Sequence, residues 1–166
     1  MLKAVDLSIG VFVRGLTNLK GLLTKGEAHG ASRGMDPSAL LTAQLAGDMY
    51  DLAAQVHWTG EGAKLAVQRL LGDPAAPLAG SPKTFAELHE RLDATIAYLR
   101  TVDPGALEAG LERTIEIQHR GGTMTFRGDR FLTEFALPSF FFHLTTAYGI
   151  LRHRGVPLQK GDFLGG

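Results

Sequence analysis

The stretch FLTEFALPSFFFHLTTAYGILRHRGVP, residues 131–157, decides the fold, because its apolar residues recur with the period of an α-helix. Asp129 just before it suits a helix N-cap, and Gly155 followed by Pro157 is typical of a helix end. We therefore predict one helix from about residue 129 to 154. Pro138 lies inside this helix and should kink it, because its ring clashes with a carbonyl one turn back.

His143 lies in the middle of the apolar stripe of this helix. At about 100° per residue, the residues within roughly 60° of its direction are Leu132, Ala136, Ser139, Phe140, Ala147 and Ile150. A buried imidazole needs partners for both ring nitrogens. Two interpretations follow. His143 is either a core histidine bonded to serine, threonine or backbone, or a ligand or proton-transfer group, since a group that titrates near neutral pH is costly to bury without a use.

Three further helices are predicted from periodic apolar residues upstream. The first spans residues 4–25 and stops at Gly26, before a loop rich in glycine and serine. The second starts at the cap signal Asp36-Pro37 and runs to about residue 71, with a bend near 58–62 where two glycines fall. The third opens with a capping box at Thr84 and ends before Pro104.

Two connections shape the predicted topology. Residues 72–83 carry three prolines and cannot be helical throughout, yet they could span up to ~40 Å, so the second and third helices can run parallel. In residues 114–127, apolar and polar residues alternate on both sides of Gly121-Gly122, which predicts a short β-hairpin. We expect one all-α domain, residues 1–166, built as a four-helix bundle with a short β-hairpin before the last helix.

Composition excludes several classes of function. Seventeen basic residues balance seventeen acidic ones, which argues against nucleic acid as a partner, and no basic cluster favours a membrane surface. The chain has no cysteine, so disulfides, thiolate metal sites and a cysteine nucleophile are excluded. The N-terminus lacks the pattern of a signal peptide, and no stretch is a good membrane span. We expect a cytoplasmic protein.

Other candidate site residues lie on the second and fourth helices. His57 falls at the edge of the second helix's stripe, beside Trp58, where it can reach a pocket mouth but where a surface or interface role is favoured. Asp48 falls at the opposite edge, where a carboxylate is more often half of an ion pair than a base. Tyr148 lies near the end of the last helix. Residues 140–142 are all phenylalanine and cover more of that helix than one stripe needs, so we expect core packing plus a homodimer surface.

The string from Phe135 to Pro157, followed by KGDFLG at 160–165, resembles a bacterial family of unknown function within the DinB/YfiT-like superfamily. Two earlier strings match it as well, LL at 40–41 with LAGDM at 45–49, and TFAEL at 84–88. The resemblance covers nearly the whole chain, and its C-terminal block is the most specific part. It implies an up-down-down-up bundle.

In DinB-like proteins that bind metal, one histidine from the second helix and an HxxxH pair from the fourth hold a divalent ion such as zinc or nickel. The resemblance places His143 at the second histidine of the pair and Ser139 at the first. The second-helix histidine has no clear counterpart, with Gln44 and Asp48 near its place and His57 further on. The resemblance thus implies a degenerate metal site with His143 as its remaining ligand.

Three hypotheses about function remain open. The first is a dimeric bundle that binds an unknown small molecule beside His143, with Ser139, Asp48, His57 and Tyr148 as further candidate pocket residues. The second, suggested by relatives in the superfamily, is a metal-dependent thiol transferase or isomerase that uses His143 with zinc or nickel. The third is a structural or stress-associated oligomer without a small-molecule site.

Overall fold

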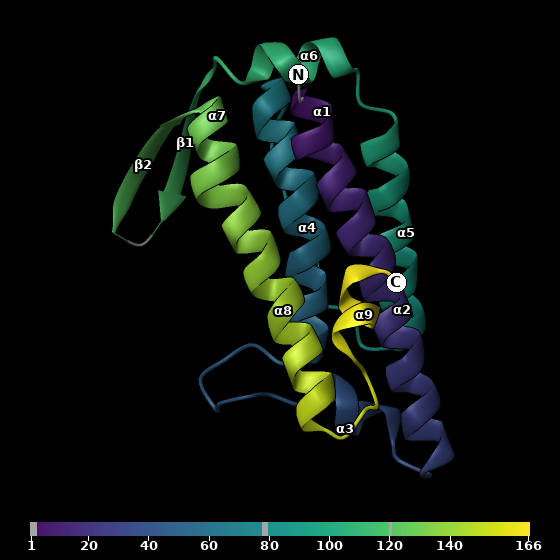
Figure 1. Ribbon diagram of the computed structural model, residues 1–166. Helices are drawn as coiled ribbons and strands as arrows, with labels where there is room; N and C mark the ends of the chain where they lie inside the picture. Colours follow the sequence, from purple (N-terminus) through teal and green to yellow (C-terminus); the bar gives the residue numbers. More distant parts are fainter. Residues whose placement is uncertain (1–2, 78–79, 120) are drawn as a thin grey trace.

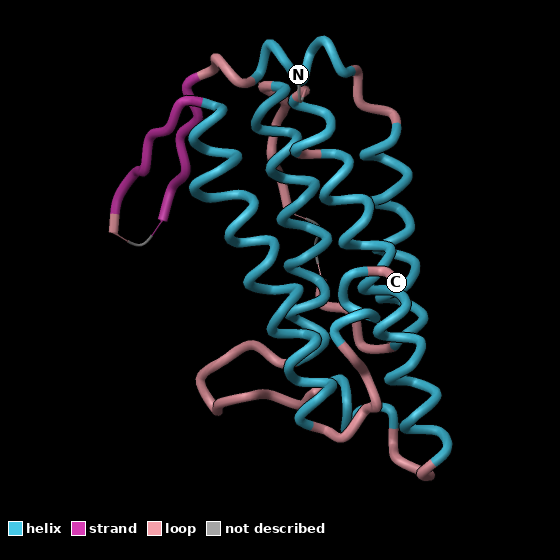
Figure 2. The backbone as a smooth tube through the Cα atoms, viewed as in Figure 1, coloured by secondary structure: helices cyan, strands magenta, loops and turns pink. Residues whose placement is uncertain are grey.

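The computed structural model describes residues 3–77, 80–119 and 121–166, and these are mostly helical with one small antiparallel hairpin (Figures 1 and 2). The helices are α1 (Ala4–Leu7), α2 (Ile9–Ser32), α3 (Pro37–Leu41), α4 (Leu52–Leu71), α5 (Phe85–Arg100), α6 (Pro104–Gly110), α7 (Gly128–Arg130), α8 (Leu137–His153) and α9 (Lys160–Leu164). A π-helical segment, η1 (Phe131–Ala136), joins α7 to α8. The strands are β1 (Thr114–His119) and β2 (Gly122–Arg127).

The four long helices α2, α4, α5 and α8 lie side by side (Figure 1). Helices α4 and α5 run in the same direction, because His57 contacts Arg91 and Gly60 lies against Leu92 and Thr95. The connection between α4 and α5 therefore crosses from one end of the molecule to the other, as the prolines after residue 71 allow.

The predicted end of the first helix at Gly26 is wrong, because α2 continues to Ser32. Gly26 is buried against α8, and a Cβ there would lie 2.8 Å from Leu151 Cδ2. The glycine therefore serves close packing between two helices and does not end one. At the other end, Ser8 separates α1 from α2, and its hydroxyl donates to the carbonyl of Ala4 at 2.6 Å.

The predicted second helix is wrong between residues 42 and 51, which form a loop between α3 and α4. The Asp36 carboxylate caps α3 through the Ser38 N–H at 2.8 Å, as predicted. A second cap is formed by Asp51, which accepts from the Ala54 N–H at 2.8 Å and starts α4. Leu45, which continues the apolar pattern in the sequence, is 45% exposed. From Leu52, α4 is a continuous helix through Gly60 and Gly62.

The third helix and the hairpin are confirmed. The Thr84 hydroxyl accepts from the Glu87 N–H at 3.1 Å and caps α5. In the hairpin, Ile115 pairs with Phe126 and Ile117 with Met124. Both isoleucines are buried, as expected for a hairpin too small to be stable without packing on the helices.

The chain from α7 to α8 differs from a regular α-helix at the position that Pro138 predicts. Proline has no N–H for the carbonyl one turn back, and its ring clashes with that carbonyl. The segment just before Pro138 is the π-helical η1. Its wider turn changes which N–H groups the carbonyls accept from. The disturbance lies N-terminal to the proline, and α8 then runs regularly past His143.

The buried core is continuous from α1 to Leu158. Where α2 meets α8, Phe12 and Phe140 pack edge to face with ring centroids 5.0 Å apart. Of the helices in the described part of the chain, none combines the length and apolar character needed to cross a bilayer.

Candidate functional site

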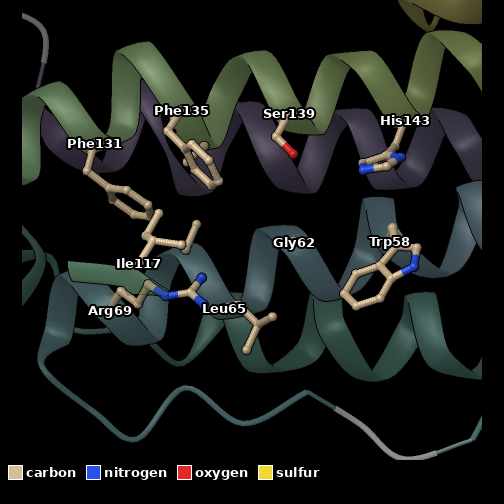
Figure 3. Close-up of a pocket in the computed structure, with 11 residues that line it drawn as sticks. Trp58, Gly62, Leu65, Arg69, Ile117, Phe131, Phe135, Ser139 and His143 are labelled. Atoms are coloured by element: carbon tan, nitrogen blue, oxygen red, sulfur yellow. The ribbon is translucent and has the colours of Figure 1, made fainter. Parts of the chain in front are cut away.

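A cavity of about 190 Å³ lies between α4 and the η1–α8 segment, with β1 against one end. Figure 3 shows Phe131, Phe135, Ser139 and His143 in a row, facing residues of α4. The lining residues are Trp58, Gly62, Leu65, Ala66, Arg69, Ile117, Phe131, Phe135, Ala136, Ser139 and His143. The walls are therefore apolar and aromatic, with few polar groups.

Helical spacing on two helices explains this lining. Trp58, Gly62, Leu65 and Arg69 follow one another at intervals of four, three and four residues, which places them on one face of α4. The opposite row has intervals of four residues throughout, from Phe131 to His143.

Small residues in the middle of both rows keep the space open. Gly62 has no side chain, and a Cβ added there would meet nothing within 4 Å. Ser139, on the opposite row, contributes only a hydroxymethyl group. Large side chains close the two ends, with Trp58 and His143 at one end and Phe131 and Arg69 at the other (Figure 3).

His143 is half-buried and bonded to Gln55 of α4, with Nδ1 2.8 Å from Oε1. The Gln55 side chain is itself oriented, because its Nε2 donates to the Tyr50 carbonyl at 3.3 Å. With the amide fixed in this way, the oxygen faces the imidazole, so Nδ1 carries the hydrogen and donates. In that neutral tautomer, Nε2 is a hydrogen-bond acceptor.

Burial lowers the pKa of His143 below its ordinary value of 6.5. The ring is therefore neutral at pH 7 and can accept a hydrogen bond from a ligand there. Aromatic rings border it on two sides, with the ring centroid of Phe142 at 5.2 Å and that of Tyr50 at 6.5 Å. The predicted partner of a core histidine, a serine, threonine or backbone group, is replaced by the Gln55 amide.

Of the residues predicted as a site, the structure brings Ser139 and His143 together at the cavity. Asp48 is exposed in the loop before α4. His57 lies between α4 and α5, where Nδ1 is 3.3 Å from an Arg91 guanidinium nitrogen, and burial and Arg91 lower its pKa. Tyr148 packs edge to face against Phe163 of α9 at 5.7 Å. These last three do not belong to the cavity lining.

Sequence reasoning missed Trp58, Leu65 and Arg69 as site residues. The signal that marks them is their shared face with Gly62 on α4, opposite the row that contains His143. Their role depends on the side chains across the cavity, so one helix read alone does not show it.

The residues around His143 do not fit the three-histidine metal site implied by the resemblance. Within the described ranges, no group of three histidine, cysteine, aspartate or glutamate residues could hold an ion. The α4 residue that faces His143 is Gln55, and the residue one turn before His143 on α8 is Ser139. Neither a neutral amide nor a hydroxyl is a ligand that zinc or nickel favours in proteins.

Comparisons with known proteins agree with the resemblance. The family described as "Domain of unknown function (DUF1993)" matches residues 5–164. The structure is similar to the crystal structure of a DinB family member protein from Shewanella denitrificans, with a TM-score of 0.86 and 37% sequence identity over 97% of this chain and 91% of that chain. No curated protein matched the chain. The resemblance predicted from the sequence is confirmed, and the chain belongs to the DUF1993 family, a DinB-like family of unknown function.

Proposed function

We propose that the protein binds a small organic molecule in the cavity between α4 and α8. The observation that carries the proposal is a space of about 190 Å³ held open by Gly62 and Ser139 between aromatic walls. Ligand sites are characteristically concave and mostly apolar, with a few polar groups that orient the ligand. Here Ser139 and the neutral imidazole of His143 are such groups.

The energetics of packing support this assignment. A cavity in a protein interior lowers stability, because the atoms that line it lose contacts on one side. An apolar ligand restores those contacts. At a concentration about 100 times its dissociation constant, a ligand raises the free energy of unfolding by ~2.7 kcal/mol.

His143 and Ser139 give the ligand its orientation in this proposal. Gln55 holds Nδ1 of His143 and does not line the cavity, so Nε2 is the ring atom left to accept from a ligand hydroxyl or N–H. Ser139 can donate or accept one turn away. The proposed role is binding, and no reaction step is assigned to either residue.

Trp58 supplies the test, because it is the sole tryptophan of the chain and it lines the cavity. We expect 1-hexanol and 3-phenylpropan-1-ol to change the fluorescence of Trp58 saturably and to raise the melting temperature. Gly62→Leu should abolish both effects, since the new side chain occupies the cavity. Gly21→Leu is the matched control, because Gly21 is also a helical glycine with open space around a Cβ but lies on exposed α2 surface.

The proposal is contradicted if neither alcohol changes the fluorescence of the wild-type protein. It is also contradicted if Gly62→Leu and Gly21→Leu respond to the alcohols equally. Circular dichroism of the two variants shows that both are folded before binding is compared.

The proposal includes a homodimer formed through the exposed phenylalanines of α8. Phe141 and Phe142 are 38% and 56% exposed, while their neighbour Phe140 is buried. Large adjacent apolar side chains on a surface favour association. Light scattering should give twice the chain mass of 17.8 kDa at micromolar concentration, and Phe142→Ser should return the particle to the chain mass. A wild-type particle of 17.8 kDa would contradict the dimer.

We also infer an up-down-down-up bundle that unfolds as one domain. Support comes from the parallel pair α4 and α5 and from Gln55 opposite His143, which fits antiparallel α4 and α8. Urea unfolding should be a single transition when followed by both circular dichroism and Trp58 fluorescence. Two separated transitions would contradict the single domain.

A further inference from the structure

We propose that Arg69 binds an anionic group of the ligand, and that the protein therefore takes a small organic acid with an apolar body. This inference rests on the proposed function, since it assigns the ligand class of the same cavity. Arg69 lines the end of the cavity near Ile117 and Phe131, away from His143 (Figure 3). The cavity thus has a cation at one end and a neutral hydrogen-bond acceptor at the other.

Arg69 is half-buried in the last turn of α4, and none of the described residues provides an acceptor for it. Across the described residues, no carboxylate or carbonyl is bonded to its guanidinium, whose five N–H groups all donate. Two exposed arginines by contrast form ion pairs: Arg127 pairs with Glu112 at 2.8 Å and with Asp129, and Arg130 pairs with Glu134 at 2.8 Å. Those pairs are exposed, whereas the less exposed Arg69 is left without one.

Burial acts on Arg69 without compensation from the protein. It lowers the pKa of the guanidinium, because a charged group is disfavoured away from water. An arginine stays charged when it is partly buried. Arg69 is therefore a partly desolvated cation, and the described residues give it no ionic partner. A bound anion would supply both the charge and the acceptors.

The helix terminus alone does not explain this arrangement. A cation in the last turn of a helix is favoured by the helix dipole, and Arg69 lies in that turn of α4. An exposed side chain would give the same benefit. Side chains on a helix point toward its N-terminus, so that of Arg69 extends back from the terminal carbonyls toward Leu65 and the cavity (Figure 3).

Carboxylate is the anionic group that best matches the geometry. The planar guanidinium forms two parallel hydrogen bonds to a carboxylate, and this pair is stronger in a partly desolvated site than on an exposed surface. The aromatic and aliphatic walls between Arg69 and His143 require an apolar body. Trp58 and Arg69 lie about 16 Å apart along the α4 axis. The Arg69 side chain reaches back along the helix, so the ligand has to span less than this distance. Medium-chain or aryl-alkanoic acids fit these limits.

Two pairs of probes that share a body and differ in the head group test the inference. Hexanoate is compared with 1-hexanol, and 3-phenylpropanoate with 3-phenylpropan-1-ol, by titration of Trp58 fluorescence at pH 7.5. We expect each acid to bind the wild-type protein at least about 10-fold more tightly than its alcohol, as a charged hydrogen-bonded pair provides. Arg69→Gln should remove this preference while alcohol affinity changes less than about 3-fold.

A matched substitution separates Arg69 from general charge. Arg100→Gln removes an exposed arginine from the last turn of α5 and should keep the full preference for acids. Arg69→Lys keeps the charge without the planar pair of donors and should keep part of it. Alcohol binding by each variant shows that its cavity is intact.

The outcomes distinguish this inference from the proposed function. If the alcohols bind but the acids bind no more tightly, the role of Arg69 is overturned while the small-molecule cavity stands. An acid preference that survives Arg69→Gln, or that falls equally in Arg100→Gln, overturns it too. If neither alcohols nor acids bind the wild-type protein, both proposals fail together.

Discussion

The two sides of α8 are packed in opposite ways. Toward α2, Phe140 fills the space so closely that a Cβ on Gly15 would lie 2.6 Å from its ring. Toward α4, one residue earlier in the chain, Ser139 faces a cavity of about 190 Å³. One helix therefore joins a dense core to an open site, and adjacent residues belong to different environments.

Glycine has contrasting uses on these two sides. Gly15 and Gly26 of α2 allow α8 to approach, and each would place a Cβ less than 3.0 Å from a side chain of α8. At Gly62 of α4, by contrast, an added Cβ would have no neighbouring atom within 4 Å. The comparison teaches that the α2 face of α8 is closely filled, whereas the α4 face leaves the cavity in which we propose binding. Substitutions on the two sides should therefore differ in sign as well as size.

The largest expected effect is the loss of the ring that fills the dense side. Phe140→Ala should lower the free energy of unfolding by about 3–5 kcal/mol, because Phe140 is 1% exposed and its removal leaves a cavity. Urea denaturation measures the change. Leu164→Ala in α9, where the side chain is 56% exposed, is the control and should cost about 1 kcal/mol or less. Equal losses in the two variants would show that the α2 side is not the dense one.

A pair of glycine substitutions in α2 should have opposite effects. Gly15→Ala forces its methyl group against Phe140 and should destabilise the protein by about 1–3 kcal/mol. Gly21→Ala meets nothing and should stabilise it by about 0.5–1 kcal/mol through helix propensity alone. Thermal unfolding of both variants in one buffer compares them. Stabilisation by Gly15→Ala would show that Phe140 moves aside freely.

Much of the fold follows from local signals in the sequence. Helical period and cap residues predict α5 and α8, and alternation around the paired glycines predicts the hairpin. The loop at residues 42–51 was missed because Leu45 and Met49 continue the apolar period by chance, while Asp51 was not recognised as a cap. Gly26 was misread because a glycine that ends a helix and a glycine that contacts another helix look alike in one sequence.

The site was predictable only where a single helix determines it. Spacing along α8 places Ser139 and His143 on one face, and both line the cavity. The cavity itself depends on volumes across two helices and a strand, so Arg69 and Trp58 carried no signal on their own. Asp48 was placed by a helix that does not exist at that position.

On the open side of α8, added volume should stabilise the protein instead of straining it. Gly62→Ala removes a helical glycine and puts a methyl group into free space, so the free energy of unfolding should rise by about 0.5–1 kcal/mol. The same methyl group should weaken binding of 1-hexanol to the cavity. Urea denaturation and Trp58 fluorescence measure the two effects, with Gly21→Ala as the variant that stabilises without affecting binding. A destabilised Gly62→Ala would indicate that this side is already filled.

The smallest expected effect is a dependence of stability on pH that comes from the open side. Burial holds the pKa of His143 below 6.5 in the folded protein, so the unfolded chain takes up a proton first as the pH falls. The stabilisation is fully present above pH 6.5 and is lost as the pH drops through the lower folded value. His57 has a pKa lowered by burial and by Arg91, and it adds a similar loss.

His143→Gln should therefore reduce the fall in urea midpoint between about pH 7.5 and 5.5 without removing it, since His57 remains. Glutamine also keeps a polar group for Gln55, so the variant tests protonation more than packing. Gly21→Ala, which changes no ionisable group and has open space around its new methyl group, should keep the pH profile of the wild-type protein. If His143→Gln has the wild-type profile as well, the imidazole is as easily protonated in the folded chain as in the unfolded one. Water would then reach His143 freely, and the cavity would not be partly desolvated. The proposed ligand site needs that desolvation, because it combines a neutral hydrogen-bond acceptor, His143, with an unpaired cation, Arg69.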